Sequence, residues 1–129
     1  MYPKDLKYTQ QHEWVRVEGN KATVGITHFA QDQLGAIVGV GLPDEGADVD
    51  RGSELADLDS MKTADQIFAP ISGKIVKVND KLEMQPELLN EDPYGEGWVV
   101  VIEIAKEEEI ASLMSADEYE AHVAKEAGE

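Results

Sequence analysis

Short stretches of alternating polar and apolar residues recur along this chain, and such alternation is typical of half-buried β-strands. The first two stretches, 12–18 and 22–26, are separated by Gly19-Asn20, a pair that favours a tight hairpin turn. Further strands are predicted, in order, at 36–42, 53–58, 66–69, 73–80 and 98–104. Because strands this short cannot bury an apolar face alone, we expect a mainly β fold built from packed sheets.

Short helices are predicted between the strands and after the last of them. Thr27 is suited to cap a helix that ends at Gly35, and Pro86 is suited to the first position of another. In the tail, apolar residues recur at helical spacing, and Ser115 with Glu118 is placed to form the capping box of a final helix. We expect the two tail helices to pack on the sheets.

A weak internal repeat indicates how the strands are arranged. Residues 35–40 and 73–78 both begin with glycine and continue as a β-branched strand. Because the two copies flank a central pair of strands, they indicate two similar half-sheets that face each other. We expect one domain over residues 1–129, with its core over about 6–104 and a C-terminal helical region over about 106–126.

The central pair of strands has a lysine between them. Residues 58–65 read LDSMKTAD, and a hairpin here would place Lys62 at its tip with Asp59 and Asp65 beside it. A lysine in an exposed turn is most often only a solvated charge. The alternative is that its amine carries a covalently attached cofactor. The stretch alone favours the first interpretation, so the surroundings decide.

Composition narrows the chemistry that the chain can perform. It has no cysteine, which excludes disulfides, thiolate metal sites and a thiol nucleophile, so any sulfur chemistry must come from an attached group. Its 27 acidic and 11 basic residues give a net charge of −16, which argues against a nucleic-acid partner and favours docking on basic patches. No apolar run approaches the roughly 18 residues of a membrane helix. With no visible targeting segment, we expect a cytoplasmic or mature organellar protein without a membrane partner.

No metal or catalytic site is predicted from the residues. His12-Glu13 begins like a zinc-protease helix, but the second histidine of that motif is missing. His28 and His122 are isolated in the sequence, and the acidic loop 44–52 lacks the register of a calcium loop. Because no nucleophile or partner base accompanies the many carboxylates, we expect a protein that is not an enzyme.

A series of short motifs runs along nearly the whole chain, and each is weak alone. They are, in order, HEW at 12–14, VGIT at 24–27, AQ at 30–31, LG at 34–35, LP at 42–43, SMK at 60–62, APISG at 69–73, VN at 78–79, PELLN at 86–90 and PYGEGW at 93–98. Taken together in this order, they resemble the glycine cleavage system H protein family.

This resemblance implies a fold, a cofactor and a set of partners. The fold would be a flattened β-barrel sandwich, the barrel-sandwich hybrid of lipoyl and biotinyl domains, with a lysine-tipped hairpin and C-terminal helices. Lys62 would carry lipoate on its side-chain nitrogen, within a recognition context of Asp59, Ser60, Met61 and Thr63. A lipoate ligase or octanoyl and lipoyl transfer enzymes would attach it, and dihydrolipoamide dehydrogenase would reoxidise it. The chain would be a carrier, and thus a substrate of its partner enzymes.

The pocket that shelters the loaded arm in this family is altered here. Its acidic groups hold an ammonium; Glu13 matches one, but Gln33 and Gln66 stand where a histidine and an aspartate are usual. Asp65 is one residue away, and in a strand such a shift turns the side chain to the other face. We predict an arm pocket of these four residues that holds an ammonium poorly, a loss on the order of 2–4 kcal/mol. Gln66→Asp should then improve retention of the cargo.

The altered pocket favours a cargo without an ammonium. The sequence therefore predicts an H-like lipoate-binding protein of bacterial sulfur oxidation, which works with a heterodisulfide-reductase-like complex. The alternative is a true glycine cleavage H protein that carries the aminomethyl group from glycine decarboxylase to the aminomethyltransferase. Two remote alternatives stay open: a biotin carrier, which Thr63 disfavours because biotinyl domains have a second methionine there, and an unmodified interaction protein.

Overall fold

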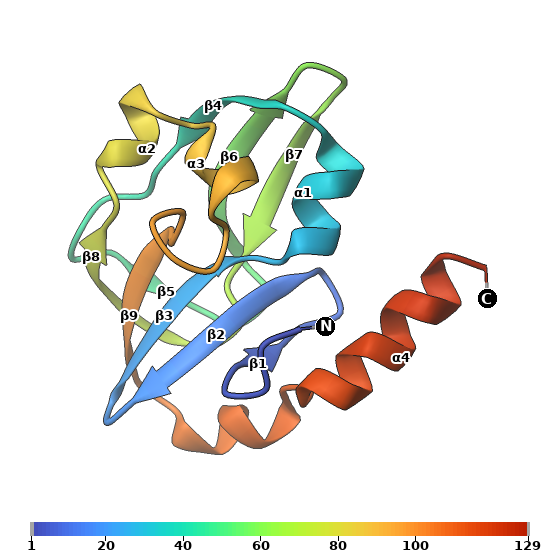
Figure 1. Cartoon of the computed structure of the whole chain (residues 1–129). Coiled ribbons are helices and arrows are strands. Elements are labelled where there is room, and N and C mark those ends of the chain that lie inside the picture. Colours follow the sequence, from blue (N-terminus) through green and yellow to red (C-terminus); the bar gives the residue numbers. More distant parts are fainter. Residues whose placement is uncertain (1, 129) are drawn as a thin grey trace.

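The strands form two antiparallel sheets in the computed structural model, which describes residues 2–128 (Figure 1). The larger sheet contains, from neighbour to neighbour, β1 (Lys7–Tyr8), β2 (Glu13–Glu18), β3 (Lys21–Ile26), β9 (Val100–Ile104), β8 (Gly73–Val78) and β5 (Asp48–Val49). The smaller sheet contains β4 (Ile37–Gly41), β6 (Glu54–Ser60) and β7 (Ala64–Phe68). The mainly β prediction is confirmed. The strands β1 and β5 were not predicted, because two residues are too few to show alternation.

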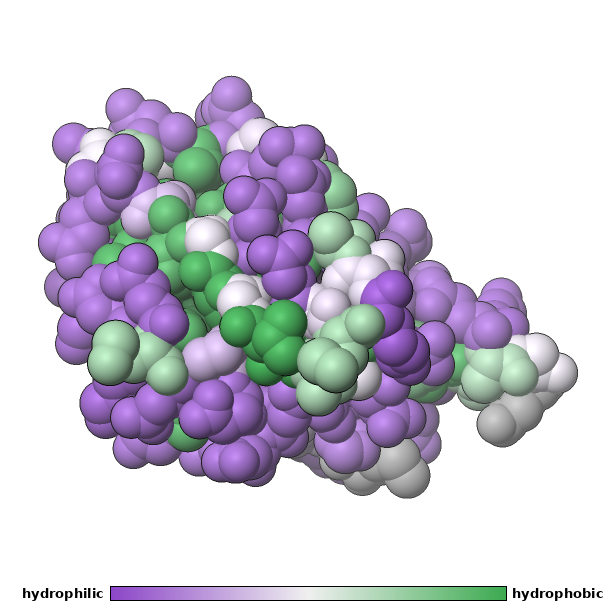
Figure 2. Space-filling view, turned by 90° about the horizontal axis from the view of Figure 1, so that it is seen from above, coloured by the Kyte–Doolittle hydropathy of each residue, from purple (hydrophilic) through white to green (hydrophobic). Residues whose placement is uncertain are grey.

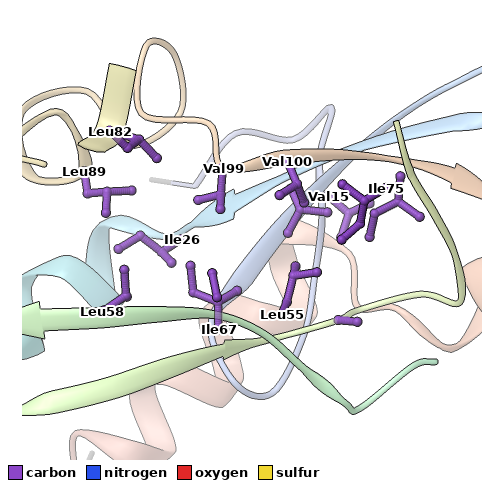
Figure 3. Close-up of a cluster of buried hydrophobic side chains, with 14 of the residues drawn as sticks. Val15, Ile26, Leu55, Leu58, Ile67, Ile75, Leu82, Leu89, Val99 and Val100 are labelled. Carbon is purple, nitrogen blue, oxygen red and sulfur yellow. The ribbon is translucent and has the colours of Figure 1, made fainter. Parts of the chain in front are cut away.

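An apolar core fills the space between the two sheets (Figure 3). Leu55, Leu58 and Ile67 from the smaller sheet lie across from Val15 and Val100 of the larger one, and each of the five is at most 4% exposed. Burial of such side chains stabilises the fold by roughly 1.5–3 kcal/mol each. The core therefore holds the β6–β7 hairpin at its base and leaves its far end outside.

The internal repeat is divided between the sheets. Its first copy forms β4 in the smaller sheet, and its second copy forms β8 in the larger sheet. The two half-sheets predicted from the repeat are therefore present.

Helix α1 (His28–Leu34) follows β3 directly, as the sequence predicts. The Thr27 hydroxyl accepts a hydrogen bond from the Ala30 N–H at 3.2 Å, which caps the first turn. Gly35 ends the helix with a φ of 77°, in the region that favours glycine.

Two other helix predictions need correction. Pro86 does not begin a helix: α3 (Leu88–Glu91) starts two residues later, and the Pro86 carbonyl accepts from the Leu89 N–H at 3.1 Å in a three-residue turn. The first tail helix is a 3₁₀ helix, η1 (Glu107–Ser112), and a short helix after β8, α2 (Lys81–Met84), was not predicted. Segments this short contain too few positions to show a helical period.

The last helix, α4 (Ala116–Glu126), begins with the predicted capping box of Ser115 and Glu118. Tyr119 of α4 is fully buried in a second apolar cluster, where its ring stacks on Tyr8 with centroids 4.7 Å apart. The helix therefore runs beside β1 and the start of β2, and its far end extends past them (Figure 1). No helix between residues 2 and 128 is long and apolar enough to cross a membrane.

The loop before β9, residues 93–98, is hydrogen-bonded to Trp14 and Asn79, two residues of the short motifs described above. The indole N–H of the buried Trp14 donates to the Pro93 carbonyl at 2.8 Å. The Asn79 amide donates to the carbonyls of Glu96 and Trp98 at 2.8 and 2.7 Å. The separate motifs around these residues thus form one connected hydrogen-bonded structure.

Candidate functional site

The turn between β6 and β7 holds Lys62 at the exposed end of the hairpin (Figure 1). The Ser60 hydroxyl oxygen accepts hydrogen bonds from the N–H groups of Lys62 and Thr63 at 3.2 and 3.1 Å. The same hydroxyl donates to the Thr63 carbonyl at 3.0 Å. One serine therefore fixes the turn, and Lys62 itself is exposed.

The hairpin tip is also fastened to the chain after α1. The Met61 N–H donates to the Ala36 carbonyl at 3.0 Å. The Lys62 side chain lies over Gly35, where a Cβ would stand 2.9 Å from its Cε. Any larger residue at Gly35 would push the lysine aside, and its φ of 77° also favours glycine.

The surface around the hairpin end mixes polar and apolar side chains (Figure 2). Met61 is 75% exposed and Val38 of the neighbouring β4 is 53% exposed. Asp59 is exposed and lies opposite Gly39 of β4 and Ala64 of β7. The predicted context residues of Lys62 are thus accessible to a modifying enzyme.

A cavity of about 330 Å³ opens beside the hairpin, between β2, α1 and β7. All four residues predicted for the arm pocket line it: Glu13, Gln33, Asp65 and Gln66. Thr63, next to Lys62, also lines it, so the cavity reaches the base of any group attached to the lysine. The structure therefore brings the predicted residues together, and occupation of the cavity by the arm stays a prediction.

The strand register shows which face of β7 Asp65 occupies, the question that the one-residue shift from position 66 raises. Asp65 pairs with the buried Leu58, and cross-strand partners share a face of the sheet. Gln66 pairs instead with the exposed Asp57, and its amide donates to the Asp57 carboxylate at 3.3 Å. Asp65 is thus the acid of β7 that lines the cavity, and Gln66, although it also lines the cavity, has its side-chain amide hydrogen-bonded to Asp57.

Glu13 is the buried acid of this cavity, at 2% exposed. Its carboxylate accepts from the Thr9 hydroxyl at 2.5 Å and from the Phe68 N–H at 3.1 Å. Burial raises the pKa of Glu13 to about 7, and the nearby charge of Asp65 also raises it. The cavity therefore has a carboxyl group that is partly ionised near pH 7, and a cation in the cavity would shift it towards the ionised form.

Other lining residues were not predicted for the pocket from the sequence, among them His12, Phe29 and Glu126. Glu126 comes from the C-terminal end of α4 and reaches the cavity because that helix docks beside β1 and places Glu126 next to His12. Burial lowers the pKa of His12, whose ring packs on Phe29 with centroids 4.7 Å apart. No pattern in the sequence predicts that Glu126 lines the cavity.

Known proteins are similar to this chain over nearly its whole length. The family model described as "Glycine cleavage H-protein" matches residues 6–126. The glycine cleavage system H protein of Brevibacillus brevis is 49% identical over 122 residues, which cover 95% of this chain and 97% of that protein. That of Bacillus subtilis is 48% identical over 118 residues, 92% of this chain and 93% of that protein. The crystal structure of a glycine cleavage system H protein from Mycobacterium marinum has a TM-score of 0.85 at 35% identity, covering 95% of this chain and 98% of that chain.

The two packed sheets and the lysine-tipped hairpin define the class as a carrier domain of the lipoyl type. The chain belongs to the glycine cleavage H-protein family. Members of this family are non-catalytic carriers with lipoate bound covalently to a lysine, and they work with glycine decarboxylase, an aminomethyltransferase and a lipoate-attaching ligase. The predictions of a non-enzymatic carrier and of lipoate are therefore confirmed, and the biotin-carrier alternative finds no support.

Proposed function

We propose that this chain is a single lipoyl-carrier domain of the glycine cleavage system, with Lys62 as the attachment point. Bound lipoate supplies a long, flexible arm with a dithiol end that can carry an aminomethyl group. The observation that carries the proposal is the cavity beside the hairpin, which Glu13 and Asp65 both line. Two carboxyl groups in reach of the arm suit a cargo that ends in an ammonium.

The tip of the hairpin has the properties of an attachment point. Lys62 is exposed, its backbone is held by Ser60, and its side chain lies over a glycine. A fixed turn presents the amine to a ligase at little cost in conformational entropy. Lys62 thereby places the arm at the rim of the cavity, where Thr63 begins the lining.

Glu13 and Asp65 suit two different tasks toward the cargo. Glu13 is buried, so a charge–charge contact there is weakly screened, but only about half of the Glu13 carboxyl groups are ionised at pH 7 because the pKa is about 7. Asp65 is exposed and attracts the ammonium at the rim with a contact that water screens. We infer that Asp65 guides the charged end and Glu13 holds it.

The structure weakens the pocket argument behind the predicted role in sulfur oxidation. That argument rests in part on the absence of an acid at position 66, and the presence of Asp65 in the lining of the cavity weakens it. The relatives named above are also described as glycine cleavage proteins. Both observations favour the glycine cleavage alternative over the partnership with a heterodisulfide-reductase-like complex.

The partners follow from this function. We propose that glycine decarboxylase loads the arm, that the aminomethyltransferase unloads it, and that dihydrolipoamide dehydrogenase reoxidises the dithiol. The net charge of −16 suits docking on basic surfaces of these enzymes. Tethering to Lys62 keeps the reacting group at a high effective concentration at each docked enzyme.

A loading assay tests the proposal. The purified chain is lipoylated, intact mass verifies the modification, and the product is mixed with glycine and glycine decarboxylase. We expect an aminomethyl adduct that disappears when aminomethyltransferase and tetrahydrofolate are added. The unlipoylated chain is the control and should gain no adduct. A fully lipoylated chain that stays unloaded would overturn the glycine cleavage assignment.

A further inference from the structure

Two histidines far apart in the sequence converge on one carboxylate at the end of α4. Nε2 of His12 lies 2.7 Å from Oε2 of Glu126, and Nε2 of His122 lies 3.0 Å from Oε1 of the same residue. The ligand-capable atoms of the three residues all lie within 4.8 Å of one another. The sequence predicts no metal here, because the zinc-protease motif that begins at His12 is incomplete and His122 is isolated in the sequence; the fold brings the two histidines together.

His12 is held in a fixed orientation by its surroundings. Its φ of 72° is uncommon outside glycine, and the backbone is kept there by hydrogen bonds from His12 N–H to the Thr9 carbonyl and from Thr27 N–H to the His12 carbonyl. Its Nδ1 lies 2.7 Å from the Tyr119 hydroxyl, and Phe29 packs against its ring. Because Nδ1 is engaged, Nε2 is the nitrogen that points into the cluster.

The other two side chains come from a single anchored helix. His122 and Glu126 are four residues apart on α4, so they share one face of the helix. Tyr119, one turn earlier, fixes that face by stacking on Tyr8 and by its hydroxyl contacts with His12 and Thr27. The distance between the two halves of the cluster is therefore set by packed structure.

We propose that His12, His122 and Glu126 form a binding site for a divalent transition-metal ion such as Zn²⁺. Two imidazole nitrogens and one carboxylate oxygen are a ligand set that these ions accept, with a water molecule in the fourth position. Ligand atoms around tetrahedral zinc lie roughly 3.4 Å apart, given bond lengths of about 2.0–2.1 Å. The nitrogen–oxygen separations of 2.7 and 3.0 Å need only small side-chain rotations to reach that value.

The chemistry of the site selects the class of ion and suggests what binding does. Ca²⁺ and Mg²⁺ require about six oxygen ligands, so one carboxylate and two imidazoles discriminate against them. The Tyr119 hydroxyl on Nδ1 of His12 is the kind of outer contact that orients a ligating imidazole. Since His12 and Glu126 also line the arm cavity, a bound ion would join the end of α4 to the cavity rim.

Zn²⁺ titration of the full chain, made without a polyhistidine tag, tests this site. The titration is followed by calorimetry in excess Mg²⁺, which occupies the exposed carboxylates. We expect one saturable Zn²⁺ site per chain and a Tm that rises by several degrees, because an ion that binds only the folded state stabilises it. His122→Ala should weaken Zn²⁺ binding by more than about tenfold. Loss of a residue that only hydrogen-bonds to a metal ligand can cost about tenfold, so loss of a ligand should cost more.

Two further variants separate metal binding from a structural role of the cluster. Glu126→Gln keeps a hydrogen-bonding group between the histidines but removes the anionic ligand, so it should retain the Tm of the metal-free chain and lose the Zn²⁺ response. His28→Ala removes an exposed histidine outside the cluster and should bind Zn²⁺ as the unmodified chain does. An unmodified chain without saturable Zn²⁺ binding, or binding that survives both His122→Ala and Glu126→Gln, would overturn the proposal.

Discussion

Within residues 2–128, two hairpins carry a lysine at or next to the turn, and one of them has the surroundings of an attachment site. Lys21 follows the Gly19-Asn20 turn between β2 and β3 and lies directly opposite Glu18 and Glu103. Lys62 lies in a turn whose backbone is hydrogen-bonded by a serine, over a glycine and beside a cavity. A lysine at a hairpin tip is thus an ordinary surface charge until a fixed turn, space and a neighbouring pocket give it a role.

The two hairpins should differ most in lipoylation when the lysine of each is replaced by arginine. Lys62→Arg keeps the charge but removes the acylable amine, so we expect complete loss of lipoylation and of glycine-dependent transfer. Lys21→Arg should leave both unchanged. Intact mass after treatment with a lipoate ligase measures the first, and aminomethyl transfer to folate measures the second. Modification that persists in Lys62→Arg would show that the wrong hairpin was chosen.

The buried acid of the cavity should give the chain a pH-dependent stability. The pKa of Glu13 rises from 4.5 to about 7 on folding, so its contribution to stability is fully present below about pH 4.5 and is lost as the pH rises through 7. Glu13→Gln should therefore be more stable than the unmodified chain at pH 8, by up to about 3 kcal/mol, and similar to it near pH 4.

Denaturant unfolding at several pH values checks this prediction. Glu18→Gln, at the exposed end of the same strand, is the matched control and should change stability by less than about 0.5 kcal/mol at every pH. A stability difference between Glu13→Gln and the unmodified chain that does not vary with pH would contradict the pKa assigned to Glu13.

The two faces of the β6–β7 hairpin should differ by a smaller amount. Asp65→Asn removes a carboxylate on the cavity side, and because Asp65 is exposed we expect retention of the aminomethyl group to fall about fivefold, which corresponds to about 1 kcal/mol. Asp57→Asn, on the outer face, should leave retention unchanged. The rate at which the loaded chain loses its aminomethyl group measures both, and equal rates would contradict the register argument.

The smallest effect is expected at Gln66, where sequence and structure make opposite predictions. The sequence predicts that Gln66→Asp improves retention of the cargo. The structure predicts no improvement, because the new carboxylate would lie opposite Asp57 and destabilise the hairpin by roughly 0.2–1 kcal/mol through like-charge repulsion. Slower loss of the aminomethyl group together with an unchanged Tm would favour the sequence-based interpretation.

Much of the fold follows from local patterns in the sequence. Alternation identified the longer strands, Thr27 and Gly35 marked both ends of α1, and Ser115 with Glu118 marked the start of α4. The strands and helices missed are two to four residues long, too short for a period to be visible. The helix start predicted at Pro86 was wrong because proline suits the first position of a 3₁₀ turn as well as that of an α-helix.

The candidate site was predictable where it is local and unpredictable where it depends on packing. Lys62 and its neighbours are adjacent in the sequence, so the motif locates them. The face on which Asp65 lies depends on the pairing with β6, and the contact of Glu126 with His12 depends on where α4 docks. The family pattern points to position 66 for the acid, and the cross-strand register shows that Asp65 pairs with the buried Leu58, which also lines the cavity.

Peptide mass mapping of the chain purified from its native host tests the central claim most directly. Proteolysis followed by tandem mass spectrometry assigns the lipoyl group to a residue. We predict a lipoyl adduct on the peptide that contains Lys62 and an unmodified peptide around Lys21. A lipoyl group on any other lysine, or a chain in which Lys62 is unmodified while the glycine cleavage enzymes are active, would contradict the account.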